Sequence, residues 1–219
     1  MSHLQKLERE VTACTKCSRL NNWCKQVAVE KKAAYRDEEY WGKPVSGFGD
    51  EEGQIVVVGL APGAHGANRT GRVFTGDRSG DWLFRAMHRA GLANQPDSVR
   101  RGDGLNLMNA WVTVAVRCAP PLNKPTPAER KMCAPFLRRE LEMLSRAKVI
   151  VCLGAIAYQA MCSDLGVSPR PKFGHGVQVA AGQYTLLCSY HPSQQNTFTK
   201  RLTEPMLDKI FADAIALTK

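Results

Sequence analysis

Three short runs of apolar residues place the strongest limit on how this chain can fold. They are Ile55–Gly59, Val112–Val116 and Val149–Leu153; none contains a charged residue, and β-branched side chains dominate each. A continuous apolar run of this length, without polar alternation, is typical of a strand that is buried on both faces, as in a parallel sheet.

Helical patterns separate these runs. Thr126 begins the clearest one, because a Thr N-cap followed by Pro and then by Glu129 is a capping-box sequence. The segment 2–34 also has a helical and polar pattern, which Cys14–Cys17 interrupts, whereas 35–53 is predicted to be a loop. The helix that begins at Thr126 is expected over 126–146. Further helices are expected over 80–90, 155–165 and 204–217.

Strands that alternate with helices predict an α/β fold in which helices cover both faces of a parallel sheet. Two further runs, 177–180 and 184–189, flank Ala181 and Gly182 and are compatible with a hairpin. Ligands of such folds bind beyond the carboxyl ends of the strands. We therefore expect the loops that follow Gly59, Cys118 and Tyr190 to converge on one cleft.

Charge and length narrow the class of protein. With 219 residues the chain suits a single domain, and its net charge of +10 favours an acidic partner such as nucleic acid. Charge alone leaves a basic enzyme without a polyanionic ligand equally open. The sequence contains no apolar run of the roughly 20 residues that a membrane span needs, and its first residues do not resemble a signal peptide. We expect a cytoplasmic protein.

Eight cysteines in a reducing compartment favour a metal site over disulfides. Cys14 and Cys17 form a Cys-x-x-Cys pair, which taken alone could also be a redox dithiol, half of a zinc site or a coincidence. Cys118 and Cys133 can supply a second pair, and four thiolates suit zinc or a four-iron cluster equally well. Cys24 is a weaker competitor as a ligand. The other three are expected in the core: Cys152, Cys162 and Cys188.

Four motifs in a fixed order carry a more specific resemblance. They are Gly59–Pro62, Phe74–Gly80, Arg117–Pro125 and Tyr190–Asn196. Together with the cysteines, they resemble the family 5 (type B) uracil-DNA glycosylases, the iron–sulfur branch of the uracil-DNA glycosylase superfamily. The resemblance covers nearly the whole chain. It implies a three-layer α/β/α sandwich around a four-stranded parallel sheet. It also implies a 4Fe-4S cluster on Cys14, Cys17, Cys118 and Cys133. Our hypothesis for the cluster is that it ties the segment of about 1–53 to the rest of a single domain.

Two positions matter for substrate choice. Gly63 stands where the first motif of family 5 usually has Ala, so the chain departs from the family's pattern there. Leu60 and Val114 stand where family 4 has an acidic residue and an Asn, and here the chain follows the broader-specificity branch. The resemblance therefore implies removal of uracil and of other deaminated bases, such as hypoxanthine, from DNA in base excision repair.

The reaction implied for the site breaks the bond between a base and deoxyribose, after the base has been flipped out of the stack. His191 would stabilise the leaving base anion, and Asp77 would position the attacking water and favour the cationic sugar. Phe74 would stack on the base, and Asn123 can offer a donor and an acceptor to the edge of uracil. The backbone of the first motif would lie against the base, at Gly59, Leu60, Ala61 and Gly63. Each of these residues also has an ordinary role open to it, in a turn, a strand end or the core.

The segment 190–202 is expected to be a loop that enters the DNA beside the lesion. Gln194, Gln195 and Phe198 are the wedge candidates. Ser193, Lys200 and Arg201 would contact the DNA backbone. A solvated surface loop is the alternative for this segment. Two other hypotheses for the whole protein stay open: a lesion-binding protein with little turnover, and an unrelated zinc or iron–sulfur protein. A monomer is expected, because the duplex itself is the partner.

Overall fold

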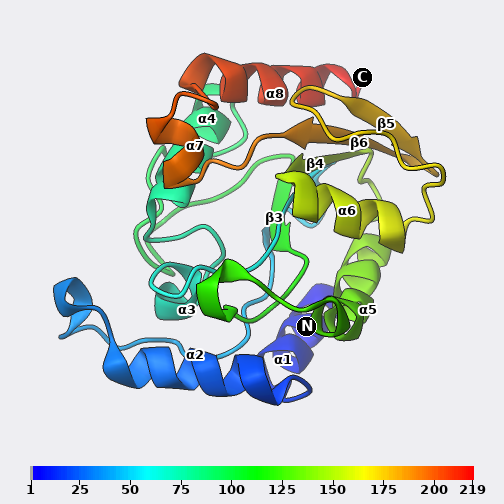
Figure 1. Ribbon diagram of the computed structural model, residues 1–219. Helices are drawn as coiled ribbons and strands as arrows, with labels where there is room; N and C mark the ends of the chain where they lie inside the picture. The colour runs from blue at the N-terminus through cyan, green and yellow to red at the C-terminus, as the bar shows by residue number, and fades with distance from the viewer. Residues whose placement is uncertain (1) are drawn as a thin grey trace.

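A single mixed sheet lies at the centre of the computed structural model, which describes residues 2–219 (Figure 1). Its strand order is β1-β3-β2-β4-β6-β5. The four central strands are parallel and comprise β3 (Ala110–Val114), β2 (Ile55–Gly59), β4 (Val149–Leu153) and β6 (Tyr184–Ser189). The predicted parallel sheet is thus confirmed, although β3 begins and ends two residues earlier than expected.

Two antiparallel strands extend the sheet at its edges. β5 (Gln178–Ala181) forms the expected hairpin with β6. β1 (Phe48–Gly49) pairs with β3 and was not expected, because it has only two residues and lies in the segment predicted to be a loop.

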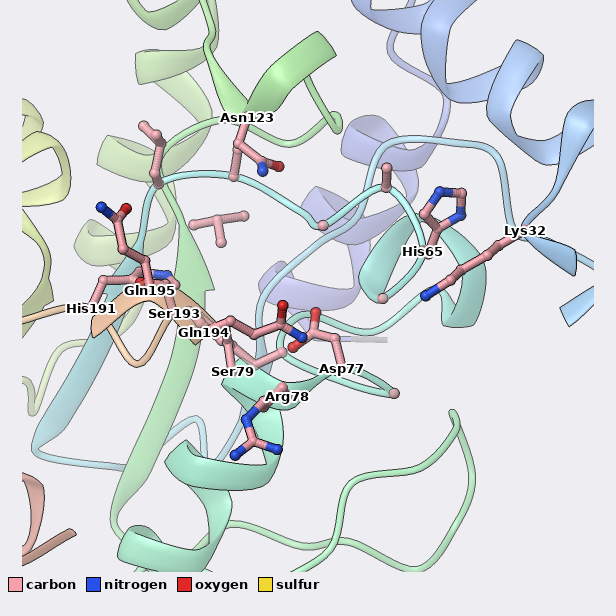
Figure 2. Close-up of a pocket in the computed structure, with 18 of the residues that line it drawn as sticks. Lys32, His65, Asp77, Arg78, Ser79, Asn123, His191, Ser193, Gln194 and Gln195 are labelled. Carbon is pink, nitrogen blue, oxygen red and sulfur yellow. The ribbon is translucent and has the colours of Figure 1, made fainter. Parts of the chain in front are cut away.

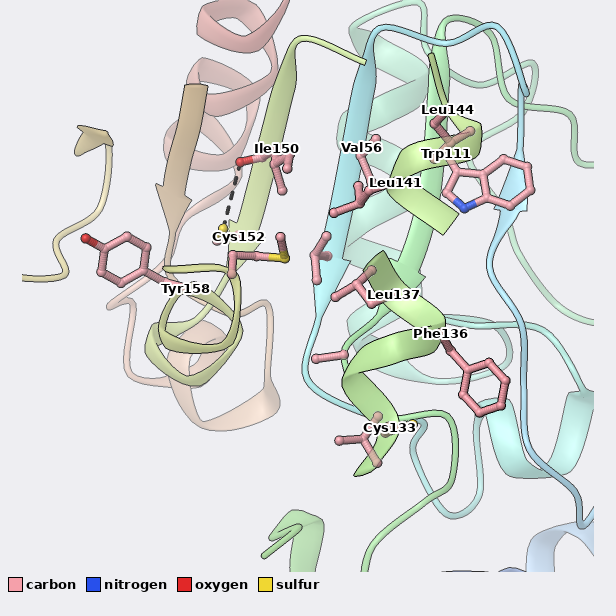
Figure 3. Packing of buried hydrophobic residues seen from close by; sticks show 14 of the residues in the cluster. Val56, Trp111, Cys133, Phe136, Leu137, Leu141, Leu144, Ile150, Cys152 and Tyr158 are labelled. Carbon is pink, nitrogen blue, oxygen red and sulfur yellow. Dashed lines mark hydrogen bonds between the residues drawn. The ribbon is translucent and has the colours of Figure 1, made fainter. Parts of the chain in front are cut away.

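Alternate residues of the central strands feed two separate cores. Val56 and Val58 pack with α1 (His3–Thr12), α5 (Pro127–Met143) and α6 (Ala155–Asp164) on one face (Figure 3). Ile55 and Val57 pack on the other face with α4 (Arg78–Arg89) and α8 (Glu204–Ala216). Because a strand turns successive side chains to opposite faces, every residue of these strands has to be apolar or small. The three-layer α/β/α architecture follows directly.

The helix boundaries agree closely with the sequence pattern. Thr126 caps α5, and Thr126 and Glu129 form both hydrogen bonds of a capping box. The N-terminal segment divides into α1 and α2 (Ser18–Glu30), with the Cys-x-x-Cys pair between them. A 3₁₀ turn follows at Ala33–Tyr35. Within residues 2–219, every helix is too short or too polar to cross a membrane.

Short elements occupy the stretches that follow the strands. α3 (Ala67–Thr70) lies in the long stretch between β2 and α4, and a 3₁₀ turn (Pro121–Asn123) lies between β3 and α5. α7 (Gln194–Phe198) occupies much of the 190–202 segment that was expected to be a loop. Leu202 is fully buried, which is a correction to the expectation that the segment enters DNA as far as this residue.

Candidate active site

A pocket of about 650 Å³ opens where the loops after β2, β3 and β6 meet (Figure 2). Asp77, Asn123 and His191 all line it, so three residues that are distant in the sequence share one cavity. The predicted convergence at the carboxyl ends of the parallel strands is therefore observed. The other predicted residues on its wall are Leu60, Ala61, Gly63, Phe74, Ser193, Gln194 and Gln195.

Asp77 is the N-cap of α4, and its Oδ1 accepts a hydrogen bond of 2.9 Å from the backbone N–H of Gly80. Burial raises the pKa of the Asp77 carboxyl above its ordinary value, while the Gly80 N–H and the charge of Arg69 act against this rise. The helix N-terminus thus holds a carboxylate whose second oxygen stays available to the pocket.

The free oxygen of Asp77 lies against two glycines of the loop that follows β2. A Cβ atom on Gly66 would lie 2.0 Å from Asp77 Oδ2, and a Cβ on Gly63 would lie 3.1 Å from the same atom. Gly66 is therefore required for this position of the carboxylate. At Gly63 an added methyl group would be tight, and the usual Ala of the family would narrow the space beside the carboxylate.

Arg69 joins the two loops that surround Asp77. Its Nε donates to the carbonyl of His65 at 2.8 Å, and its Nη2 donates to the carbonyl of Gly76 at 2.8 Å. The guanidinium also pairs with Glu38 and lies 3.9 Å from the ring centroid of Tyr35. One side chain therefore fixes the loop after β2, the residue before Asp77 and the N-terminal segment relative to one another.

His191 follows β6 and faces the opposite wall of the pocket. Within residues 2–219 its ring has no hydrogen-bond partner, and burial lowers the pKa of the imidazole to about 4. The ring is then neutral at neutral pH, with one nitrogen acting as a donor and the other as an acceptor. Its backbone is held in place, because the carbonyl of His191 accepts from Asn196 Nδ2 at 2.9 Å.

Phe74 lies beside His191, with 6.0 Å between the ring centroids. Its φ of 51° is unusual for a bulky side chain and costs conformational energy. Two glycines make the position accessible: a Cβ on Gly59 would lie 2.6 Å from the Phe74 ring, and a Cβ on Gly80 would lie 1.9 Å from the Phe74 carbonyl oxygen. Gly59 thus lies behind the ring of Phe74 and is not among the residues on the pocket wall.

Asn123 reaches the pocket from the 3₁₀ turn after β3. Asn123 and Leu122 both have a positive φ, 56° and 54°. The Asn123 side chain makes no hydrogen bond with the described residues, so its amide is free to pair with a ligand.

The remaining predicted DNA-contact residues lie outside the pocket. Phe198 is 65% exposed and stacks with Arg78, whose guanidinium carbon is 4.7 Å from the ring centroid. Lys200 is exposed, and Arg201 lies 4.7 Å from the ring centroid of Tyr190. These positions leave the two cations at the surface beside α7. Their contacts with a ligand, like the roles of the pocket residues, stay predictions.

The four cysteines proposed as ligands belong to one neighbourhood. Cys14, Cys17, Cys118 and Cys133 all pack in the core that α1 and α5 share. Burial raises the pKa of the Cys133 thiol, and the neighbouring Cys17 and Cys14 raise it further. The backbone N–H of Arg117 donates to Cys133 Sγ at 3.3 Å. Sulfur ligands with such an N–H donor fit the coordination of an iron–sulfur cluster.

A site for a single metal ion, such as zinc, would require these thiols to lie closer together than a four-iron cluster does. Across residues 2–219 there is no group of three or more His, Cys, Asp or Glu side chains that could hold one metal ion. In a four-iron cluster each thiolate binds a different iron, so the ligands are more widely spaced than around a single ion. Cys24, the competing candidate, is buried, and its Sγ lies 3.6 Å from the carbonyl oxygen of Ala119.

Several residues of the pocket wall were not expected from the sequence. Lys32 and Tyr35 come from the N-terminal segment, and His65 comes from the loop after β2. Arg78 and Ser79 come from the first turn of α4. The loop that contains His65 was expected at the cleft because it follows the strand that ends at Gly59, but nothing singled out His65 itself, and no local pattern pointed to Lys32.

The fold and the pocket define a class of protein that binds a small ligand at the carboxyl ends of a parallel sheet, with a carboxylate and a neutral imidazole on facing walls. The family model of the uracil DNA glycosylase superfamily matches residues 46–215. The chain therefore belongs to the uracil-DNA glycosylase superfamily.

Individual relatives agree with this membership. The type-5 uracil-DNA glycosylase of Mycobacterium tuberculosis is 52% identical over 209 residues, which are 93% of this chain and 78% of the relative. The type-5 enzyme of Thermus thermophilus is 49% identical over 93% of each chain. The type-4 uracil-DNA glycosylase of Archaeoglobus fulgidus is 33% identical over 73% of this chain and 63% of that protein.

Proposed function

We propose that this protein is a monofunctional uracil-DNA glycosylase of base excision repair. The observation that carries the proposal is the convergence of Asp77, Asn123 and His191 on one pocket. The names of the type-5 relatives, at about half identity over most of the chain, point to the same activity.

The facing walls supply what the reaction needs. As the N-glycosidic bond breaks, electrons move into the base, which leaves as an anion, and the sugar gains positive charge at C1′. A neutral imidazole N–H at His191 donates to the base oxygen on which negative charge develops, and the Asp77 carboxylate faces the cationic sugar. The free oxygen of Asp77 also orients the water whose oxygen forms the new bond to C1′, and it accepts the proton that this water loses.

Base recognition is assigned to two further residues of the pocket, Asn123 and Phe74. The Asn123 amide pairs with the edge of the base, and the ring of Phe74 lies along its face. Val114 lies on the pocket wall at the position where family 4 has Asn. An apolar side chain there makes no hydrogen-bond demand on the base, so we include hypoxanthine and other deaminated bases among the substrates.

A panel of duplex oligonucleotides, each with one lesion, tests this function. Alkali cleavage after incubation reports base release, and His191→Ala serves as the control variant. Release of uracil above this control supports the enzyme. Gel-shift binding without release from any substrate would instead favour a lesion-binding protein with little turnover.

We also propose that Cys14, Cys17, Cys118 and Cys133 hold a 4Fe-4S cluster, and that this cluster ties the segment of about 1–53 to the rest of a single domain. The cluster has no assigned chemical step, since base release needs no electron. The expected readouts are iron and sulfide content, visible absorption and thermal stability. A Cys118→Ala protein that lacks iron and is as stable and active as the parent would contradict this proposal.

The partner in this proposal is DNA that contains uracil or another deaminated base, which would place the enzyme at the nucleoid. We expect it to act as a monomer, because the duplex itself is the partner. Light scattering on the protein alone and with a uracil duplex measures this.

A further inference from the structure

We infer that Lys32 and His65 form a subsite for a DNA backbone phosphate next to the extruded nucleotide. This inference rests on the proposed function, and it assigns a ligand class to a part of the pocket that the base and the attacking water do not use. The two residues line the wall opposite His191 (Figure 2).

Tyr40 engages the Nδ1 atom of His65, so Nε2 is the ring nitrogen left for a ligand in the pocket. The Tyr40 hydroxyl oxygen accepts from the backbone N–H of Lys32 at 3.3 Å and lies 3.1 Å from His65 Nδ1. We assign the tautomer in which the Tyr40 hydroxyl donates its proton to Nδ1, which then acts as the acceptor. In a neutral imidazole this places the ring proton on Nε2, leaving an N–H donor on a pocket-lining residue.

The surroundings of His65 keep the ring neutral. Burial lowers the pKa of His65, and the nearby charges of Lys32 and Arg69 lower it further. The side chain is thus a permanent hydrogen-bond donor near neutral pH, without a charge of its own. A neutral donor beside an ammonium group is well suited to an oxyanion.

Lys32 brings a charge that no carboxylate in residues 2–219 neutralises. Its ammonium makes none of the ion pairs of the structure, whereas its neighbour Arg69 pairs with Glu38. Glu30, the acidic residue closest in the sequence, accepts a hydrogen bond from Gln26 Nε2 at 2.7 Å, and Glu38 is held by Arg69. In Figure 2 the Lys32 side chain extends from the N-terminal segment toward the middle of the pocket.

The layout of the pocket indicates which anion this wall binds. The base is assigned to Phe74, Asn123 and His191. The sugar is assigned to Asp77, which lies between His191 and Lys32 in Figure 2. In a DNA strand the group that continues from the sugar is a phosphodiester with one negative charge. Lys32 and His65 offer one positive charge and one neutral donor in the corresponding place.

The subsite also gives the N-terminal segment a part in substrate binding. Lys32 follows α2, and the segment is held against α3 by three hydrogen bonds: Trp41 N–H to the Arg69 carbonyl, Gly42 N–H to the Asn68 carbonyl, and Asn68 Nδ2 to the Cys24 carbonyl. These bonds place α2 relative to the pocket. They thereby hold the N-terminal segment so that Lys32 lies at the pocket wall.

A double-substitution cycle tests the inference, in which the loss of the Lys32 charge is combined with the loss of the charge on one DNA phosphate. The affinity of Lys32→Met and of the parent protein is measured for uracil duplexes in which one flanking phosphate at a time is replaced by an uncharged methylphosphonate. Lys25→Met is the matched control, because Lys25 is exposed on α2, the helix that precedes Lys32, and does not line the pocket. We expect Lys32→Met to weaken binding about three- to tenfold at low salt and to reduce the salt slope by about one.

The expected pattern is specific. One methylphosphonate position should weaken the parent by the same factor and should have no further effect on Lys32→Met. His65→Gln, which keeps an N–H donor, should retain more affinity than His65→Phe. Equal effects of the Lys32 and Lys25 variants, or additivity at every flanking phosphate, would overturn the subsite. Failure of the parent protein to release uracil would contradict the proposed function. The binding cycle tests the subsite separately, because it measures affinity and does not depend on turnover.

Discussion

The two facing walls of the pocket hold their titratable groups in opposite ways. The Asp77 carboxylate is bound to a helix N-terminus through Gly80, whereas the His191 ring lacks any hydrogen-bond partner among the residues described here. Burial favours the uncharged form of both, since it raises the pKa of Asp77 and lowers that of His191 to about 4. One buried environment can therefore hold the Asp77 carboxylate and a neutral His191 ring together. The difference is that the carboxylate has a fixed hydrogen-bond donor, whereas the His191 ring has none.

The largest expected effect comes from removing the charge on the Asp77 wall. Asp77→Asn keeps an oxygen that can accept from Gly80 N–H, so the helix cap survives while the carboxylate is lost. We expect the single-turnover rate of uracil release to fall by about 10³-fold. A fall of less than tenfold, with unchanged circular dichroism, would remove Asp77 from the chemistry.

Changing the opposite wall should have a smaller effect. His191→Ala removes one neutral donor to the leaving base, and we expect the same rate to fall by about 10²-fold. Because the ring is uncharged above a pKa of about 4, the parent should show no loss of rate from His191 protonation between pH 8 and 5. A rate that rises as the pH falls through 6.5 would mean that the cationic imidazole is the active form.

The two glycines beside Asp77 provide a graded test of the carboxylate wall. Gly66→Ala would place a Cβ 2.0 Å from Asp77 Oδ2, so the carboxylate must move, and we expect a loss of about tenfold or more in rate. Gly63→Ala would place its Cβ at 3.1 Å, and a change of about threefold or less is expected. Equal effects of the two variants on single-turnover rates would contradict the position assigned to Oδ2.

The smallest effects should appear in stability against pH, with opposite signs for the two walls. His191 has a folded pKa below its ordinary value of 6.5, so acidification from about 6.5 to 4 protonates the unfolded chain first and destabilises the fold. Asp77 has a raised folded pKa, so its destabilising contribution is present above that value and is relieved as the pH falls.

Melting temperatures of the variants measure this difference. Relative to the parent, Asp77→Asn should be more stable at pH 8, and the difference should shrink toward acid pH. His191→Gln should lose less stability than the parent between pH 6.5 and 4. Parallel pH profiles for all three proteins would show that neither group titrates as described.

The central part of the fold could be predicted from the sequence, because the β-branched runs leave few alternatives to buried parallel strands. The pairing of Phe48 and Gly49 with β3 could not, since two residues carry no detectable period. The start of α5 was predictable because its capping box is local, whereas the end of β3 was misplaced. Ala115 and Val116 continue the apolar run beyond the strand and bond to the carbonyls of Gly59 and Leu60.

In the site, too, residues that belong to local motifs could be predicted, whereas residues placed by contacts between distant segments could not. Asp77, Asn123 and His191 could be assigned to one cavity because each follows a predicted strand, and because the motifs resemble a known family. Lys32 and His65 were missed, since their positions depend on how α2 packs against α3 through contacts such as Asn68 with the Cys24 carbonyl. A single sequence contains no local sign of such a contact.

The hydrogen bond between Asp77 Oδ1 and Gly80 divides one carboxylate into two oxygens with separate tasks. A partial rotation about the last side-chain bond would break the cap, so once the helix has formed the torsion is restricted to positions that present one oxygen to Gly80 and the other to the pocket. The entropy of orienting the second oxygen is then lost during folding and is not lost again at each turnover. A more flexible acid in the same place, such as Glu, would have to be ordered anew in every catalytic cycle.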